Sequence, residues 1–237
     1  MENLLDKLDL ILSLLINLLL IGSWIFTQLM EWSKKRVVAR FFGAERITIY
    51  FPGRNLGRTM PVIAAEDFYA AYHLAEFLRN HRIEVNLKHI PVDANINFEP
   101  GSIVICGPKS SPRTKEILST DPYYKFKEEG GLWKFIDTTT NNELLSPSDK
   151  QPAENIDIAY FGRLQLGKND PNFVTMIAGL HAIGSYGVVH YITNLKVLKQ
   201  IDNETGNQRF STLISTYYDP QSMNILSSGL QMPLKKH

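Results

Sequence analysis

Three segments of the chain combine glycine with basic or hydroxylated side chains, the composition of loops that hold anions. The first is Phe51-Pro-Gly-Arg-Asn-Leu-Gly-Arg58. Its glycines allow a ligand to approach the backbone closely, and Arg54 and Arg58 can hold a phosphate through paired hydrogen bonds. A solvated basic loop beside anionic lipid headgroups would have the same composition. Both interpretations remain open at this point.

The second segment, Gly107-Pro-Lys-Ser-Ser-Pro112, follows an apolar run and precedes a helical pattern that begins near Arg113. Free N–H groups and hydroxyls at a helix start bind anions, and Lys109 adds positive charge beside Ser110 and Ser111. The alternative is an ordinary strand-to-helix turn capped by serine. The segment lacks the G-x-x-x-x-G-K-[ST] pattern, so the sequence gives no support for ATP hydrolysis.

The third segment, Gly179-Leu-His-Ala-Ile-Gly-Ser-Tyr-Gly187, has three glycines and offers His181 and Ser185 as ligand contacts. Its spacing is only loosely that of a dinucleotide-binding loop, and no acidic residue ends a strand about 20 residues further on. Tight helix packing explains the glycines equally well, and a histidine at a helix start is commonly a capping or packing residue. Asp157 and Arg163, near a neighbouring apolar run, are expected in the same region.

Apolar runs and helical spacing predict the elements that position these segments. Strands are expected at Ile47–Phe51, Val85–Ile90, Ile103–Cys106, Ile156–Phe161 and Phe173–Ala178, and helices at Glu66–Asn80, Arg113–Ser119 and His181–Lys199. Alternating strands and helices are typical of an α/β domain with a mainly parallel sheet. Because ligands of such sheets bind at the carboxyl ends of the strands, the three segments are the candidate site.

Two hairpin inserts and one polar loop are also expected. Leu132–Asp137 and Glu143–Ser146 flank a turn-rich stretch, and Val197–Ile201 and Arg209–Tyr217 flank another. The polar stretch from Ser146 to Asn155 is predicted to be a surface loop.

A long uncharged run, Leu10–Met30, precedes the domain. As a helix it spans about 31 Å, the thickness of a hydrocarbon core. The acidic residues before it do not fit a cleaved signal peptide. Basic residues follow it, since residues 31–60 contain seven Lys or Arg and two Asp or Glu, which places the rest of the chain in the cytoplasm. We divide the chain into residues 1–40, a transmembrane helix with a basic juxtamembrane segment, and residues 41–237, the cytoplasmic domain. A hydrophobic helix buried in a soluble core is the alternative.

Polar residues within this helix form one interrupted stripe that includes Ser13, Asn17 and Thr27. A lone spanning helix gains nothing from an amide facing lipid, so the stripe is expected to face other copies of the helix. The stripe therefore predicts a homo-oligomer. A pore lined by these side chains is a further hypothesis.

Composition excludes several classes of protein. A formal net charge of +1 does not fit a strongly basic nucleic-acid binder, and no direct nucleic-acid partner is expected. The single Cys106 excludes an intramolecular disulfide framework, and His73 and His89 have no partners at metal-ligand spacing, so no metal or cofactor is expected. No known catalytic motif is present, and enzymatic activity stays uncertain.

The layout of one spanning helix joined to an α/β domain with basic, glycine-containing strand ends resembles the membrane effectors of bacterial antiphage systems that respond to nucleotides, including CARF-like membrane proteins. The stretches Ile103–Pro112 and Ala178–Gly187 also resemble segments of uncharacterised bacterial α/β domains. The resemblance implies a Rossmann-like sensor domain that binds a nucleotide second messenger, and membrane helices that permeabilise or depolarise the bacterial inner membrane.

Three functional hypotheses follow. The leading one is an oligomeric nucleotide sensor and membrane effector whose ligand contacts are Arg54, Arg58, Lys109, Ser110, Ser111, His181 and Ser185. The second is a membrane-tethered hydrolase of a nucleotide such as NAD, with His181 or Asp157 as acid or base. The third is a non-catalytic membrane scaffold for a protein partner.

Overall fold

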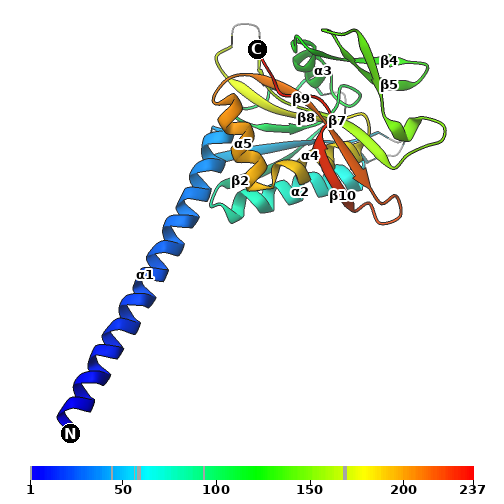
Figure 1. The fold of residues 1–237 in the computed structure, drawn as a ribbon. Coiled ribbons are helices and arrows are strands. Elements are labelled where there is room, and N and C mark those ends of the chain that lie inside the picture. The colour runs from blue at the N-terminus through cyan, green and yellow to red at the C-terminus, as the bar shows by residue number, and fades with distance from the viewer. Residues whose placement is uncertain (1, 44, 56, 58–59, 93, 168–169) are drawn as a thin grey trace.

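A single long helix leads into a mixed α/β domain (Figure 1). The computed structural model describes residues 2–43, 45–55, 57, 60–92, 94–167 and 170–237, with side chains in the first helix described from Leu12 onward. Helix α1 (Glu2–Phe42) contains a stretch long and apolar enough to cross a membrane, and the apolar side chains between Leu12 and Met30 are exposed. The long apolar helix expected from the sequence is confirmed, and it is continuous through the basic segment.

The last turns of α1 are part of the domain core. Val38, Phe41 and Phe42 are buried, and the Phe41 ring stacks on Phe161 with 6.3 Å between ring centroids. Arg40 Nε donates to the buried Asp202 carboxylate at 2.7 Å. The last turns of α1 and the domain therefore share one hydrophobic core. The boundary drawn at residue 40 falls inside this shared core.

The main sheet has a parallel half and an antiparallel half. Its strand order is β10-β9-β7-β8-β3-β1-β2, with β11 (Lys235–Lys236) paired to β9. The parallel half consists of β1 (Arg46–Pro52), β2 (Glu84–Ile90), β3 (Ile103–Ile105) and β8 (Phe173–Gly179). The antiparallel half consists of β7 (Ile156–Gln165), β9 (Phe210–Tyr218) and β10 (Ile225–Leu230).

The two faces of this sheet are covered differently. Helices α2 (Ala65–Asn80), α4 (Ala182–Ile192) and α5 (Leu195–Thr205) pack on one face together with the end of α1. Helix α3 (Pro112–Ser119) and a second sheet of β4 (Tyr124–Glu129), β5 (Leu132–Asp137) and β6 (Asn142–Leu145) lie over the other face. A short 3-10 turn, Pro147–Asp149, joins the second sheet to β7.

Several predictions made from the sequence are corrected here. The sheet is mixed, because only seven residues, 166–172, separate β7 from β8, and a parallel connection needs a crossover of about a dozen or more. The single helix His181–Lys199 is two helices, since the Asn194 side chain caps a new one by accepting from Lys196 N at 3.0 Å. Val197–Ile201 is therefore helical, and β9 pairs instead with β10. The hairpin of β5 and β6 is confirmed, with β4 added beside it.

Candidate functional site

A cleft lies at the carboxyl ends of β1, β3 and β8. From β1 the chain passes through α2 to β2 on one side, whereas β3 lies on the other side of β1, so the crossover direction changes between β1 and β3. Open α/β sheets bind ligands at such a switch point. The cleft has a volume of about 400 Å³, and its lining includes Arg54, Asp67, Lys109, Ser110, His181 and Ser185. The three segments selected from the sequence therefore converge.

Arg54 follows β1 and is held by backbone and side-chain contacts. Its N–H donates to Val62 O at 2.7 Å, and its Nη2 donates to Asp67 Oδ2 at 2.8 Å. Asp67 comes from the first turn of α2 and is buried, and this burial raises the pKa of its carboxyl to about 6 although Arg54 opposes the shift. The Arg54 side chain stays two-fifths exposed, and its buried Nε has no hydrogen-bond partner among the described residues.

Lys109 and Ser110 follow β3. Lys109 Nζ donates to Leu180 O and lies 5.8 Å from the centroid of the Trp133 ring, and desolvation lowers the pKa of the lysine. Lys109 makes no ion pair among the described residues. Its positive charge is thus held over the cleft by a carbonyl and an aromatic ring.

His181 is the N-cap residue of α4 and is bracketed by two carboxylates. Its Nδ1 lies 3.1 Å from Asp157 Oδ1 and its Nε2 lies 3.2 Å from Asp149 Oδ1. The hydrogen bond with Asp157 raises the pKa of His181, more than its partial burial lowers it. The fully buried Asp157 also accepts from the backbone N–H groups of His181 and Gly184, at 3.0 and 2.9 Å. These amides at the start of α4 are already occupied by a carboxylate of the protein itself.

The glycines of the third segment serve packing. A Cβ on Gly184 would clash with the Asp157 carboxylate, and one on Gly187 would clash with Thr216. Ser185 Oγ accepts from Gly179 N at 2.9 Å and closes the turn between β8 and α4. The resemblance of this segment to a dinucleotide loop is thus explained by close contact between α4 and the sheet, as the alternative interpretation held.

Arg163, expected in the same region as Asp157, lies instead at the amino ends of the parallel strands, where its Nη1 donates to Gly206 O at 2.7 Å. Ser111 is buried and caps α3 by accepting from Thr114 N at 3.3 Å. Arg58 lies outside the described residues. Ser13, Asn17 and Thr27 are exposed on α1 and fall within an arc of about 80° at 3.6 residues per turn. Thr27 Oγ1 already donates to Ser23 O at 2.8 Å.

Sequence reasoning missed two acidic residues of the cleft region. Asp67 looked like a helix-start residue favoured by the dipole, and only its burial against Arg54 distinguishes it. Asp149 and Ser146 belong to the stretch expected to be a surface loop, but Ser146 is buried and its Oγ donates to Asp157 Oδ1 at 2.7 Å. Because the stretch is rich in polar residues, its composition predicts an exposed loop. The sequence therefore contains no indication of the contact between Ser146 and Asp157.

The site thus combines Arg54, Lys109 and a basic His181 with the carboxylates of Asp67, Asp149 and Asp157. Among the residues described, no group of three or more His, Cys, Asp or Glu side chains is arranged to hold a metal ion. No protein-family model matches the chain, and no significant match is found among curated proteins or solved structures.

Proposed function

We propose that the protein is a membrane-anchored sensor that binds a phosphorylated small molecule, a nucleotide messenger, in the cleft between β1 and β3. The observation that carries this proposal is the convergence of Arg54, Lys109 and Ser110 at the point where the crossover direction changes. The parallel half of the sheet supplies the Rossmann-like part of the fold, and the phosphate would lie between the two cations.

The mixed charge of the cleft favours a nucleotide over a simple anion. Glu66 and Asp67 line the same cleft as Arg54 and Lys109. Their carboxylates can accept hydrogen bonds from ribose hydroxyls or base amino groups, while the cations hold the phosphate. A purely anionic ligand would meet repulsion from these carboxylates.

Helix α2 supplies a physical connection between the cleft and the membrane helix. Its first turn carries Asp67, and the residues after its last turn, His81 and Arg82, line a groove against α1. In this proposal α1 spans the bacterial inner membrane with the domain in the cytoplasm. A ligand that favours one position of α2 would shift the packing of α1 in a homo-oligomer and permeabilise the membrane, as in the antiphage effectors that the architecture resembles.

Calorimetric titration of the full-length protein in detergent tests the binding step. The probes are ATP, NAD, a cyclic dinucleotide and a cyclic oligoadenylate. Because a hydrogen bond to a charged group contributes about 1.5–3 kcal/mol, Lys109→Ala should weaken binding of the active probe about 10- to 100-fold. Lys115→Ala, which removes an exposed cation from α3, is the matched control. Equal affinity of both variants and the wild type would refute the site.

A nucleotide hydrolase is the second candidate, and the contacts of His181 favour it. Asp157 orients the His181 imidazole through Nδ1, and Nε2 could act as a general acid or base if a substrate displaced Asp149 from it. Incubating the full-length protein with NAD and following product formation separates the candidates. If the wild type turns over NAD and His181→Gln does not, the hydrolase hypothesis is supported. If NAD binds stoichiometrically without turnover, the sensor hypothesis is favoured.

A further inference from the structure

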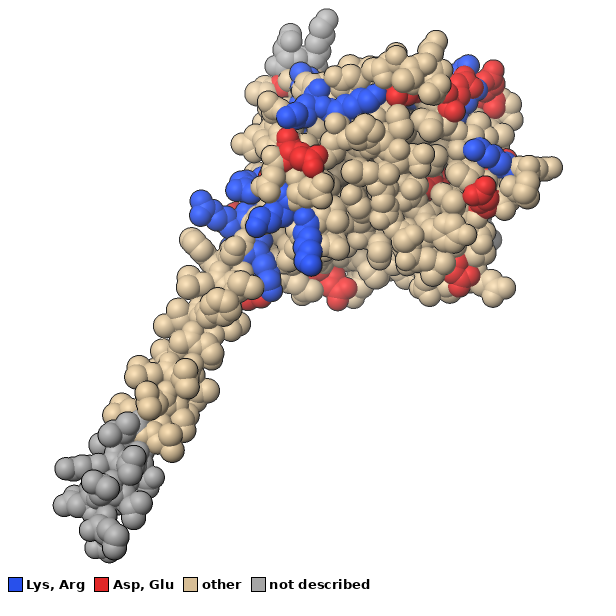
Figure 2. All heavy atoms as spheres, in the orientation of Figure 1, with Lys and Arg blue, Asp and Glu red and all other residues tan. Residues whose placement is uncertain are grey.

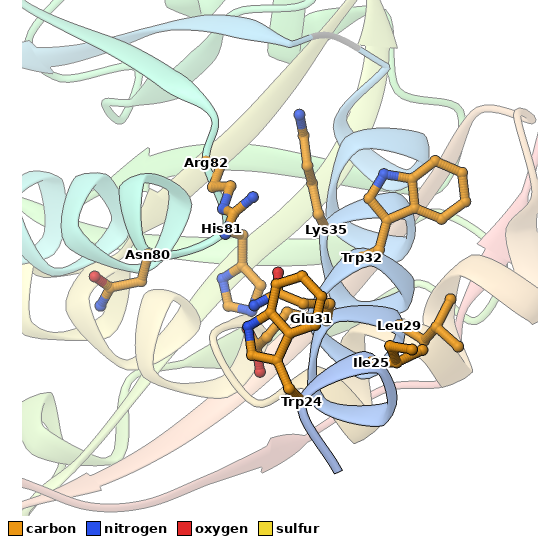
Figure 3. Close-up of a pocket in the computed structure, with 10 residues that line it drawn as sticks. Trp24, Ile25, Leu29, Glu31, Trp32, Lys35, Asn80, His81 and Arg82 are labelled. Atoms are coloured by element: carbon orange, nitrogen blue, oxygen red, sulfur yellow. The ribbon is translucent and has the colours of Figure 1, made fainter. Parts of the chain in front are cut away.

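A groove separates the middle of α1 from the end of α2 (Figure 3). It has a volume of about 280 Å³, and its walls include Trp24, Leu29 and Lys35 from α1 and His81 and Arg82 after α2. In this view Trp24, Glu31 and Lys35 lie on the side of α1 that faces His81 and Arg82, whereas Ile25, Leu29 and Trp32 project from its other side. The groove is apolar at one end and basic at the other.

The position of the groove along α1 is that of a membrane surface. The apolar run ends at Met30, and the groove is lined by α1 residues from Trp24 to Lys35, which lie on both sides of that point. Trp24 and Trp32 are each about two-thirds exposed, as expected of aromatic side chains at the headgroup level. With α1 in a bilayer, Asn80, His81 and Arg82 are therefore brought to the depth of the lipid headgroups.

Arg82 occupies a backbone position that glycine normally fills. It follows the C-cap residue of α2 in the left-handed region, with φ of 58°. Its N–H donates to Arg79 O at 2.8 Å, and the N–H of Ile83 donates to Leu78 O at 3.1 Å, which together form a Schellman motif. An arginine there costs conformational energy that a glycine would avoid. Such a cost points to a role for the side chain.

Among the described residues, Lys35 and Arg82 form no ion pair with Glu31, the carboxylate that lines the same groove. The hydrogen bond with Lys34 lowers the pKa of Glu31, and the charge of Arg82 adds to this shift. Within the part of the chain that the structure describes, neither Lys35 nor Arg82 makes a side-chain hydrogen bond or ion pair, while Glu31 is paired with Lys34 at 2.6 Å. Lys and Arg side chains also gather at the junction of α1 with the domain (Figure 2). An anionic ligand would give Lys35 and Arg82 the ion pairs that Glu31 does not make with them.

We propose that this groove binds the headgroup of an anionic phospholipid such as phosphatidylglycerol. Lys35 and Arg82 contact the phosphate, and Trp24, on the same side of α1, packs against the acyl chains. The bound lipid ties the end of α2 to the membrane surface and so fixes the tilt of the domain. This inference rests on the proposed membrane insertion of α1, but it is independent of the ligand in the cleft.

Native mass spectrometry of the full-length protein in detergent, titrated with phosphatidylglycerol, tests this site. Since a basic residue at a membrane surface contributes about 1 kcal/mol, Lys35→Gln and Arg82→Gly should each weaken lipid binding about fivefold, and together about 25-fold. Arg82→Gly is the sharper variant because it relieves the left-handed strain, so it should keep or raise the melting temperature while lipid binding falls. Arg82→Lys should retain most of the binding.

Control variants and control ligands distinguish binding of the lipid in the groove from a general effect of charge. Lys115→Gln removes one exposed cation far along the chain from the groove and should leave the affinity unchanged. Phosphatidylcholine and soluble glycerol phosphate should both bind more weakly than phosphatidylglycerol. Equal phosphatidylglycerol affinity of all variants, or equal binding of glycerol phosphate, would overturn the lipid site. A chain that fails to insert into vesicles at all would instead refute the membrane placement of α1.

Discussion

The two ends of the parallel strands are built in opposite ways. At the amino ends, the last turn of α1 is packed into the core, and the carbonyl of Phe41 in that turn accepts from the buried Arg163 guanidinium. That guanidinium also lies 5.1 Å from the Phe41 ring centroid. At the carboxyl ends, Arg54 and Lys109 stand over an open cleft with partly exposed charges. The amino end is a joint closed around Phe41 and Arg163, with a pocket of about 350 Å³ beside it, and the carboxyl end is an open polar site.

This difference indicates that the amino ends of the strands serve stability and that the carboxyl ends serve binding. At the amino end the buried Arg163 guanidinium is satisfied inside the protein, since it donates to Phe41 O and Gly206 O. At the carboxyl end a buried carboxylate, Asp67, is kept at a raised pKa, which is a cost to the folded state. Proteins retain such costs at functional sites. The Arg54 loop lies at the carboxyl ends of the strands, whereas α1 joins the domain at the amino ends. This placement disfavours the alternative in which the Arg54 loop contacts lipid headgroups.

The largest expected effect is at the joint. Phe41→Ala removes a ring that is 1% exposed and packs against Phe161 and Phe210, and it should destabilise the protein by about 3–5 kcal/mol. Denaturant unfolding of the full-length protein in detergent measures this loss. Phe26→Ala makes the same change on the same helix at a ring that is 64% exposed.

Phe26→Ala should change the unfolding free energy by less than about 0.5 kcal/mol. If both variants were equally stable, the end of α1 would not belong to the domain core, and the contrast between the two ends of the strands would fail.

A smaller effect of opposite sign is expected at the cleft. Because burial raises the pKa of Asp67 from 3.8 to about 6, its contribution to stability is present below pH 3.8 and is lost as the pH rises through 6. Above pH 6 the wild-type protein carries a buried charge, so Asp67→Asn should stabilise it there by about 1–2 kcal/mol, less at lower pH. Unfolding free energies measured from pH 4 to 8 test this.

Glu66→Gln, one residue earlier in the same turn of α2, is the matched control and should give no such stabilisation. A destabilised Asp67→Asn protein at pH 8 would mean that the ion pair with Arg54 outweighs the burial of the carboxylate. The cleft would then resemble the closed joint instead of contrasting with it.

The sequence indicated which segments follow strands, but not how the strands are ordered. The Arg54, Lys109 and His181 segments were selected because each comes directly after an apolar strand, whereas the strand order that brings them together at one cleft has no signal in the sequence. The antiparallel half was missed although the seven-residue connection of β7 to β8 forbids a parallel crossover. Connection length is the signal that would have found it.

Other features have no local signal. Phe41 and Phe42 look like the end of an apolar helix whether they enter a core or a membrane surface. Asp157 caps α4 from a distant strand, and such a contact between segments 24 residues apart depends on the tertiary fold. The Schellman motif after α2 was hidden because Arg82 replaces the glycine that normally marks it.

The smallest expected effect lies beyond the joint, on the exposed part of α1. In the proposed homo-oligomer, the joint would transmit the state of the cleft to α1 helices that associate through the stripe of Ser13 and Asn17. A hydrogen bond between membrane helices contributes about 0.6 kcal/mol, so Asn17→Leu should weaken self-association of the full-length protein about threefold per contact. Leu18→Ile, at the neighbouring position, is the control. Sedimentation equilibrium in detergent measures both. Tighter association of Asn17→Leu than of the wild type would mean that Asn17 faces lipid or detergent. The joint would then only anchor the domain to α1, because no second helix would pack on this stripe.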